Sequence, residues 1–198
     1  MYKVGLTGSI GVGKTTVSEM FAAHNIDVFD ADLIAKDLTK QDSRYFNEIV
    51  THFGDRVLTK NQLNRKMLRN IIFSDAHEKI WLEELLHPAI LEQLISQSDN
   101  ANSSYCILVI PLLIEKDLQH LVNRTLVVQA DGDLQMARAM QRDESNKQLI
   151  ESIKYNQASV EELLTHADDV ITNNKALNDL KPQVLELHNS YLEHAKSS

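Results

Sequence analysis

The clearest chemistry in this sequence lies in a glycine-rich stretch, GLTGSIGVGKTT, at 5–16. Gly8, Gly13, Lys14 and Thr15 match the spacing G-x-x-x-x-G-K-[ST]. Such a loop turns successive backbone N–H groups toward an anion. Its lysine reaches the β- and γ-phosphates of a nucleotide, and its hydroxyl ligates Mg²⁺. The spacing predicts a nucleoside triphosphate site but leaves the phosphate acceptor open.

Two aspartates close the apolar stretch VFDAD. Asp30 and Asp32 follow a predicted strand at 27–29, next in sequence to the phosphate loop and its helix. A carboxylate there can orient a hydroxyl that attacks the γ-phosphate and then accept its proton. Aspartate is also a favoured helix N-cap. Both interpretations stay open, and one aspartate can serve each.

Further along the chain, Gln135, Arg138 and Arg142 are spaced three and four residues apart, so they share one helix face. Two arginines on one face suit the grip on a transferring phosphoryl group. By themselves they also fit a solvated surface, and the phosphate loop favours the first interpretation. His87 beside Pro88, and the basic run at 65–69, fit structural or surface roles when taken alone.

The elements that must position these residues alternate along the chain. Apolar runs predict strands at 3–7, 27–29, 106–110, 125–129 and, more weakly, 169–172, with helices between them, including one at 16–23. This order predicts an α/β fold with a parallel sheet and helices on both faces. Ligands in such sheets bind at the carboxyl ends of the strands. The predicted nucleotide-binding core therefore comprises 1–33 and 105–198.

The segment at 34–104 departs from this alternation and predicts a helical insertion. Pro88 is expected to break or kink its long apolar helix, or to begin a new one. A polar loop is expected at 96–104. The tail at 176–195 predicts a closing helix whose buried stripe is Leu177, Leu180, Val184, Leu187 and Tyr191.

Composition sets further bounds on function. The 198 residues are 43% hydrophobic and 24% charged, and 28 acidic against 20 basic side chains give a formal net charge of −8. This balance argues against nucleic-acid or membrane-surface partners. The lone Cys106 excludes an intramolecular disulfide and fits a small buried side chain. With no signal peptide or membrane-spanning run visible in the sequence, we expect a cytoplasmic protein.

Together these motifs resemble the dephospho-coenzyme A kinase family. The resemblance rests on GLTGSIGVGKTT, DAD at 30–32, LNRKMLR at 63–69, LLHP at 85–88, VIPLLIE at 109–115, MQRD at 140–143, Gln157 and ADDVITNN at 167–174. They stand in the family's order across nearly the whole chain. The resemblance implies a P-loop core, a helical acceptor domain at 34–104 and a lid at about 131–160. It also implies ATP-dependent phosphorylation of the ribose 3′-hydroxyl of dephospho-CoA with Mg²⁺.

The resemblance also implies roles for individual residues. Asp32 would be the base, with Lys14 and Arg142 as phosphate stabilisers and Thr15 as the metal ligand. ATP would be bound by Gly11, Val12, Gly13, Lys14, Thr15, Thr16, Arg138 and Asn174. The acceptor would be bound by Thr7, Asp30, Arg65, His87, Leu112 and Glu115. We expect a monomer or weak homo-oligomer that acts on the small-molecule substrates ATP and dephospho-CoA.

Some positions depart from the family pattern. Ser9 replaces a usual glycine, and Val12 and Thr15 replace usual serines, although Thr15 keeps its hydroxyl. Lys175 stands where a glycine often follows the asparagine in the family. This difference lies directly beside Asn174, the residue expected near the adenine of ATP. The second magnesium ligand stays open, with Asp30 or Glu115 as candidates.

Three rival functions remain as alternatives. A regulatory GTPase needs an N-K-x-D base reader, but NKAL at 174–177 lacks the aspartate. A purely structural nucleotide-binding module leaves Asp32 and the arginine pair without a role. The nearest rival is a kinase of another small acceptor, such as a nucleoside monophosphate.

Overall fold

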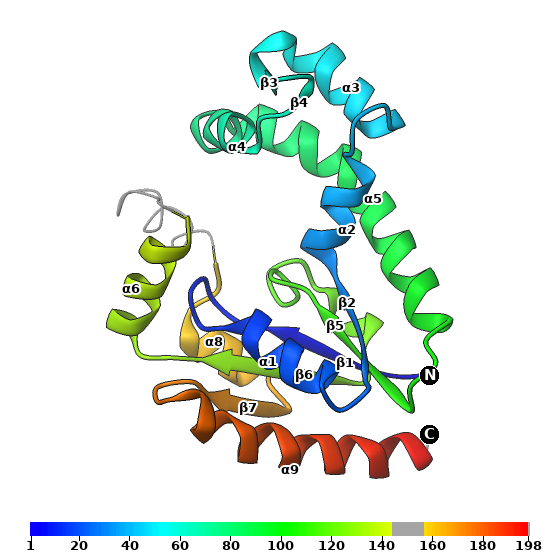
Figure 1. Cartoon of the computed structure of the whole chain (residues 1–198), viewed down its shortest axis with the longest axis vertical. Coiled ribbons are helices and arrows are strands. Elements are labelled where there is room, and N and C mark those ends of the chain that lie inside the picture. The colour runs from blue at the N-terminus through cyan, green and yellow to red at the C-terminus, as the bar shows by residue number, and fades with distance from the viewer. Residues whose placement is uncertain (144–156, 198) are drawn as a thin grey trace. The chain divides into compact units, whose positions relative to one another are not determined.

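The computed structural model describes residues 1–143 and 157–197, with side chains in the first range up to residue 141 (Figure 1). The chain divides into two compact units. The first combines Met1–Phe29 with Gln97–Ser198, and the second is Asp30–Ser96. Each unit is considered by itself below.

A five-stranded sheet forms the centre of the first unit. Its strands are β1 (Tyr2–Thr7), β2 (Asp27–Asp30), β5 (Tyr105–Val109), β6 (Arg124–Gln129) and β7 (Asp169–Thr172), in the spatial order β2-β5-β1-β6-β7. β1 pairs in parallel with β5 and β6, and β6 pairs in parallel with β7. The carboxyl ends of these paired strands therefore meet at one edge, where the loop after β1 begins.

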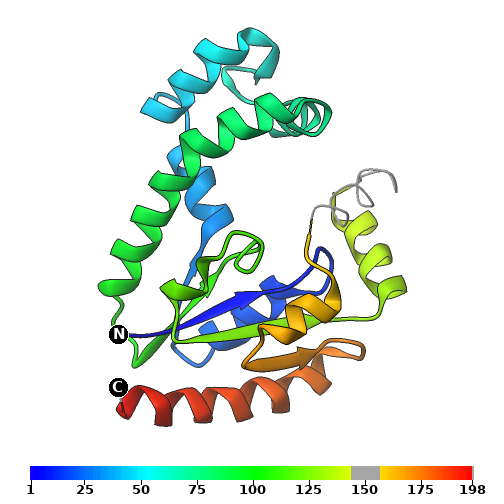
Figure 2. The same cartoon turned by 180° about the vertical axis from the view of Figure 1, so that it is seen from behind.

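Both faces of this sheet are covered by helices because both faces are apolar. α1 (Lys14–Ala22) and α9 (Leu177–Lys196) pack on one face, where their side chains join Leu126 and Val128 in the main core cluster. Val127, between those two strand residues, points to the other face and packs with Leu163 of α8 (Val160–Thr165). Figure 2 shows α8 on the side of the sheet opposite α1. Successive side chains of β6 thus pack into two separate hydrophobic cores, one on each face of the sheet.

Two further elements complete the described part of the first unit. α6 (Gly132–Asp143) follows β6, and its Ala139 packs on Ile10 of the loop after β1. The short 3-10 helix η2 (Leu118–Leu121) lies between β5 and β6 in the chain. The packing of Ala139 places α6 beside the glycine-rich loop.

The second unit is mainly helical. It contains α2 (Ala31–Leu38), α3 (Arg44–Phe53), the 3-10 helix η1 (Asp55–Val57), the two-stranded hairpin β3 (Leu58–Thr59) and β4 (Gln62–Leu63), α4 (Arg65–Ser74) and most of α5 (Ala76–Asp99). Its core cluster consists of Ile49, Phe53, Val57, Leu68 and Leu82. The unit therefore has a hydrophobic core of its own.

The predicted α/β architecture and its five strands are confirmed, each strand within one residue at either end. Two local expectations are wrong, and the alternatives for Pro88 are narrowed. Pro88 lies inside α5, so the helix neither breaks there nor begins anew. Residues 96–99 are helix rather than loop. Leu177 is 59% exposed and so falls outside the buried stripe of α9. Leu177 is the first residue of its helix, where the core no longer covers that face.

The hairpin at 58–63 was not predicted. Lys60 and Asn61 at its turn both have positive φ, 50° and 59°, and two-residue strands leave no periodic signal in the sequence. None of the helices in the described ranges is long and apolar enough to span a membrane.

Candidate active site

The glycine-rich loop curves tightly around the end of β1. Gly8 has φ 143°, and a Cβ added there would lie 2.3 Å from the carbonyl oxygen of Val128. Gly11 has φ 78°, and its added Cβ would lie 2.3 Å from the carbonyl oxygen of Gln135. Both positions combine a left-handed backbone with close backbone neighbours, so any side chain there would displace β6 or α6. The glycines are thus explained by the fold as well as by the motif.

The loop leads directly into α1, whose first residue is Lys14. The Lys14 ammonium donates to the carbonyl oxygens of Gly8 and Ser9, at 2.6 Å and 3.1 Å. Gly13 is the N-cap and supplies no side-chain cap, so the first-turn N–H groups are not capped from that position. A helix N-terminus of this kind favours an anion. A cation and a set of backbone donors therefore sit on the same short stretch.

Magnesium can be tested against Thr15. This residue is exposed in the first turn of α1, so its hydroxyl oxygen is accessible to a metal ion. Among the residues that the structure describes, no group of three or more His, Cys, Asp or Glu side chains could hold a metal. A single protein oxygen fits Mg²⁺, which keeps several waters and binds largely through substrate phosphates.

Asn173, directly after β7, is a site residue that the sequence reasoning missed. It is 6% exposed, and its side-chain amide donates to the carbonyl oxygen of Val12 at 2.8 Å. The neighbouring Asn174, which was predicted to lie near adenine, is paired with Asp131 through two hydrogen bonds of 2.8 Å and 2.7 Å. The signal that could have found Asn173 is its place at a strand's carboxyl end beside the loop.

The predicted arginine pair lies on α6. Arg138 donates to the backbone carbonyl oxygen of Asn173 at 2.9 Å, which links α6 to the end of β7. Arg142 belongs to the last turn of α6, but its side chain lies outside the described residues. Residues 144–156 of the predicted lid, 131–160, likewise lie outside them.

Three predicted acceptor residues also lie in the first unit. Thr7 is fully buried, and its hydroxyl donates to the carbonyl oxygen of Pro111 at 3.3 Å, so it joins the ends of β1 and β5. Leu112 is half-buried in the turn after β5. Glu115 accepts the backbone N–H of Ala158 at 2.9 Å through Oε1. Its Oε2 is buried without a hydrogen-bond partner in the described part of the chain.

The two aspartates of the second unit have different surroundings. Asp30 is the N-cap of α2, and its Oδ1 accepts the backbone N–H groups of Asp32 at 2.7 Å and Leu33 at 3.2 Å. Asp32 is exposed in the first turn of the same helix, where the helix dipole favours a negative charge. The structure therefore gives the capping role to Asp30.

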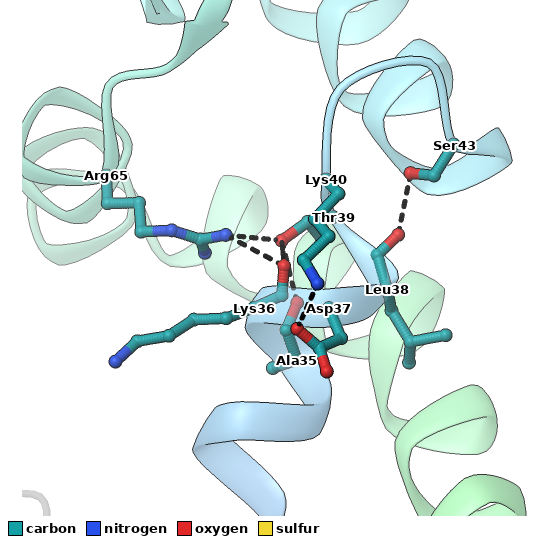
Figure 3. Close-up of polar contacts among 8 residues, drawn as sticks. All are labelled: Ala35, Lys36, Asp37, Leu38, Thr39, Lys40, Ser43 and Arg65. Atoms are coloured by element: carbon teal, nitrogen blue, oxygen red, sulfur yellow. Dashed lines mark hydrogen bonds and ion pairs between the residues drawn. The ribbon is translucent and has the colours of Figure 1, made fainter.

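Arg65 lies at the opposite end of α2. Its guanidinium donates to the Thr39 hydroxyl at 2.8 Å and to the carbonyl oxygen of Lys36 at 3.2 Å (Figure 3). The Thr39 hydroxyl in turn donates to the carbonyl oxygen of Ala35 at 2.7 Å. Burial lowers the pKa of the Arg65 guanidinium from its usual value. The contact places positive charge at the C-terminal end of α2, which the helix dipole favours.

His87 lies within α5 and is half-buried. The structure thus groups the predicted residues into two sets. The first unit holds the loop, Arg138, Asn174, Thr7, Leu112 and Glu115, and the second holds Asp30, Asp32, Arg65 and His87.

Comparison with known proteins agrees with this geometry. The family model described as dephospho-CoA kinase matches residues 2–179. A dephospho-CoA kinase from Shewanella oneidensis is 42% identical over 193 residues, covering 97% of this chain and 94% of that protein.

Solved structures give the same picture for the fold. A crystal structure of a Thermus thermophilus protein matches with a TM-score of 0.82 at 26% identity, covering 96% of this chain and 97% of that one. A dephospho-CoA kinase from Campylobacter jejuni matches with a TM-score of 0.68 at 24% identity, covering 97% and 98%.

Proposed function

Because the chain belongs to the dephospho-CoA kinase family, we propose that it transfers the γ-phosphoryl group of ATP to the ribose 3′-hydroxyl of dephospho-CoA. The products are ADP and coenzyme A, in the last step of coenzyme A biosynthesis. The family match over residues 2–179 supports the acceptor, and the observation that carries the donor half of the proposal is the phosphate loop. Its Lys14 ammonium, first-turn amides and exposed Thr15 lie on one short stretch of chain.

The first unit would bind the donor. Loop and first-turn amides hold the phosphates, and the Lys14 ammonium stabilises the charge that moves onto the β–γ bridging oxygen as the bond breaks. Arg138 and Arg142 would approach from α6, and Asn174 would lie near the adenine. Thr15 would hold Mg²⁺, which supplies charge neutralisation between the β- and γ-phosphates when bound.

The second unit would bind the acceptor. The exposed Asp32 carboxylate accepts the hydrogen bond of the 3′-hydroxyl, orients its oxygen toward the γ-phosphorus and takes its proton as the new bond forms. Asp30 supports this residue by capping the helix that carries it. Arg65 and His87 would contact the anionic acceptor, with Leu112 from the first unit. Thr7 and Glu115 of the first unit, which bond to backbone groups of Pro111 and Ala158, would also contribute to acceptor binding.

The proposal is tested by incubating the purified protein with ATP, Mg²⁺ and one acceptor at a time. Dephospho-CoA, a nucleoside monophosphate and shikimate form the panel, with ADP release and the mass of the phosphorylated product as readouts. We expect coenzyme A from dephospho-CoA and no product from the others. Equal turnover of a nucleoside monophosphate would instead support the rival acceptor.

Two further properties belong to the proposal. We place the enzyme in the cytoplasm as a monomer or weak homo-oligomer. Fractionation of cells that express the chain tests the cytoplasmic location. Sedimentation over a range of protein concentrations measures the assembly state. A concentration-independent oligomer would contradict the assembly state.

A further inference from the structure

Two amide side chains from the second half of the chain hold the phosphate loop on either side of Gly11. Gln157 accepts the backbone N–H of Ile10 through Oε1 at 3.0 Å. Asn173 donates its side-chain N–H to the carbonyl oxygen of Val12 at 2.8 Å. One amide therefore serves as an acceptor and the other as a donor, on residues that are two apart in the loop.

Each amide is itself fixed by its neighbours. The residue after Gln157 donates its backbone N–H to Glu115 at 2.9 Å, which ties this point of the chain to the turn after β5. Asn173 donates its own backbone N–H to the carbonyl oxygen of Gln129 at 2.8 Å and accepts from Arg138 at 2.9 Å. Strand ends and α6 thus set where both amides lie.

The loop also has no room to move toward Asn173. A Cβ added at Gly13, where φ is 95°, would lie 2.4 Å from Nδ2 of Asn173. Asn173 is 6% exposed, so water has little access to replace its bond to Val12. A buried carbonyl oxygen that loses its hydrogen-bond donor destabilises the folded state. The loop shape and the Asn173 amide therefore depend on each other.

We propose that Gln157 and Asn173 are positioning residues that hold 10–13 in the shape that binds phosphate. The inference rests on the nucleotide site proposed above. A free glycine-rich loop loses conformational entropy when it closes on an anion, and a loop already held in place loses less. Neither residue touches the substrate, and each acts through the loop backbone.

The two amides make opposite demands, which gives a selective experiment. Position 157 needs only an acceptor, so Gln157→Glu should keep the bond and change the KM for ATP by less than about threefold. Gln157→Met has a similar shape without an acceptor and should raise this KM about tenfold. Position 173 needs a donor, so Asn173→Asp and the uncharged Asn173→Leu should both raise it about 10- to 100-fold.

The measurements are the KM for ATP and kcat with dephospho-CoA, with calorimetric titration of ATP into each folded variant. We expect kcat at saturating ATP to change less than the KM for ATP, and the KM for dephospho-CoA to stay constant. A purely structural role would lower the melting temperature without this split. If Asn173→Leu fails to fold, the Gln157 pair still decides the outcome.

The inference is overturned if Asn173→Asp and Asn173→Leu bind ATP as the unmodified chain does, or if Gln157→Glu and Gln157→Met are equally weakened. A failure of the proposed function has a different signature, because the unmodified chain would then not phosphorylate dephospho-CoA, while calorimetric titration of ATP would still test the effect of each variant on the loop.

Discussion

The phosphate loop and the candidate residues of the helical unit are held in different ways. Residues 8–13 are fixed by groups far away in the sequence, including Val128, Gln157 and Asn173. Asp30 and Asp32 are held by their own helix, since the cap bonds span two and three residues. Arg65 lies between these extremes, because it bonds to the end of α2 from 26 and 29 residues away.

The difference reflects the chemistry each region must perform. A loop that meets several phosphate charges needs many donors aimed at one place, which a short segment cannot fix by itself. A single carboxylate needs only a rigid base, and a capped helix end supplies one. Damage to the loop should therefore spread through the fold, whereas damage to the helix end should stay local.

The largest effect is expected from Asp32→Asn. The substitution keeps the size and one oxygen but removes the charge and basicity, so kcat should fall by about 10²–10⁴-fold, the range of a general base. The KM for ATP should change little. Steady-state kinetics with dephospho-CoA measure both, and Asp37→Asn, exposed on the same helix, is the matched control. Loss of thermal stability without loss of kcat would mean that Asp32 supports the helix instead.

A slightly smaller effect is expected from Lys14→Ala. Removing the ammonium should lower kcat by about 10²–10³-fold, because its charge stabilises the transition state. The fold should persist, since Gly8 and Ser9 keep their backbone geometry through β6 and α6. ADP release and circular dichroism are the measurements, and Lys196→Ala at the exposed end of α9 is the control. Near-normal turnover would refute the phosphate-loop assignment.

Asp30→Ala should act mainly on stability. Loss of the N-cap of α2 should lower the free energy of unfolding by about 1 kcal/mol, whereas Asp30→Ser should retain most of it. Urea unfolding measures the total, and hydrogen exchange at the Asp32 and Leu33 amides locates the change. If Asp30→Ala lowers kcat as strongly as Asp32→Asn, the division of roles between the two aspartates is wrong.

Much of the fold could be predicted because its signals are local. Five apolar runs and one complete loop motif predict the α/β core, and all five strands are confirmed. The sequence could not decide between a break, a kink and a new helix at Pro88, because the outcome depends on tertiary packing, and Leu82 and Ala89 of the continuous helix are buried. The hairpin at 58–63 escaped because two-residue strands carry no period.

A residue of the site could be predicted only where a sequence motif specifies its type and position. Lys14 and Asp30 follow from spacing and strand ends, but Asn173 and Asn174 look alike in sequence. Only the fold shows that Asn173 is buried against Val12 while Asn174 pairs with Asp131. The partner of an amide depends on tertiary contacts, so the choice between adjacent asparagines could not be made from the sequence.

The smallest effect is expected from a change of pH. It should act on the free energy of unfolding through His188 in the first unit. Burial, and then the neighbouring His24, hold the pKa of His188 below its usual 6.5. The two rings stack with centroids 4.7 Å apart, and Nδ1 of His188 lies 2.8 Å from the hydroxyl of Tyr105. As pH falls through 6.5 the unfolded chain binds a proton that the folded protein resists, so the free energy of unfolding should decrease.

Urea unfolding between about pH 7.5 and 5.5 measures this decrease, and His188→Gln should reduce it. His24→Ala removes one of the two causes and should reduce it less, because burial remains. If the free energy of unfolding of His188→Gln depends on pH as that of the unmodified chain does, other titratable groups cause the effect. His188 would then not make the first unit more sensitive to acid than the second.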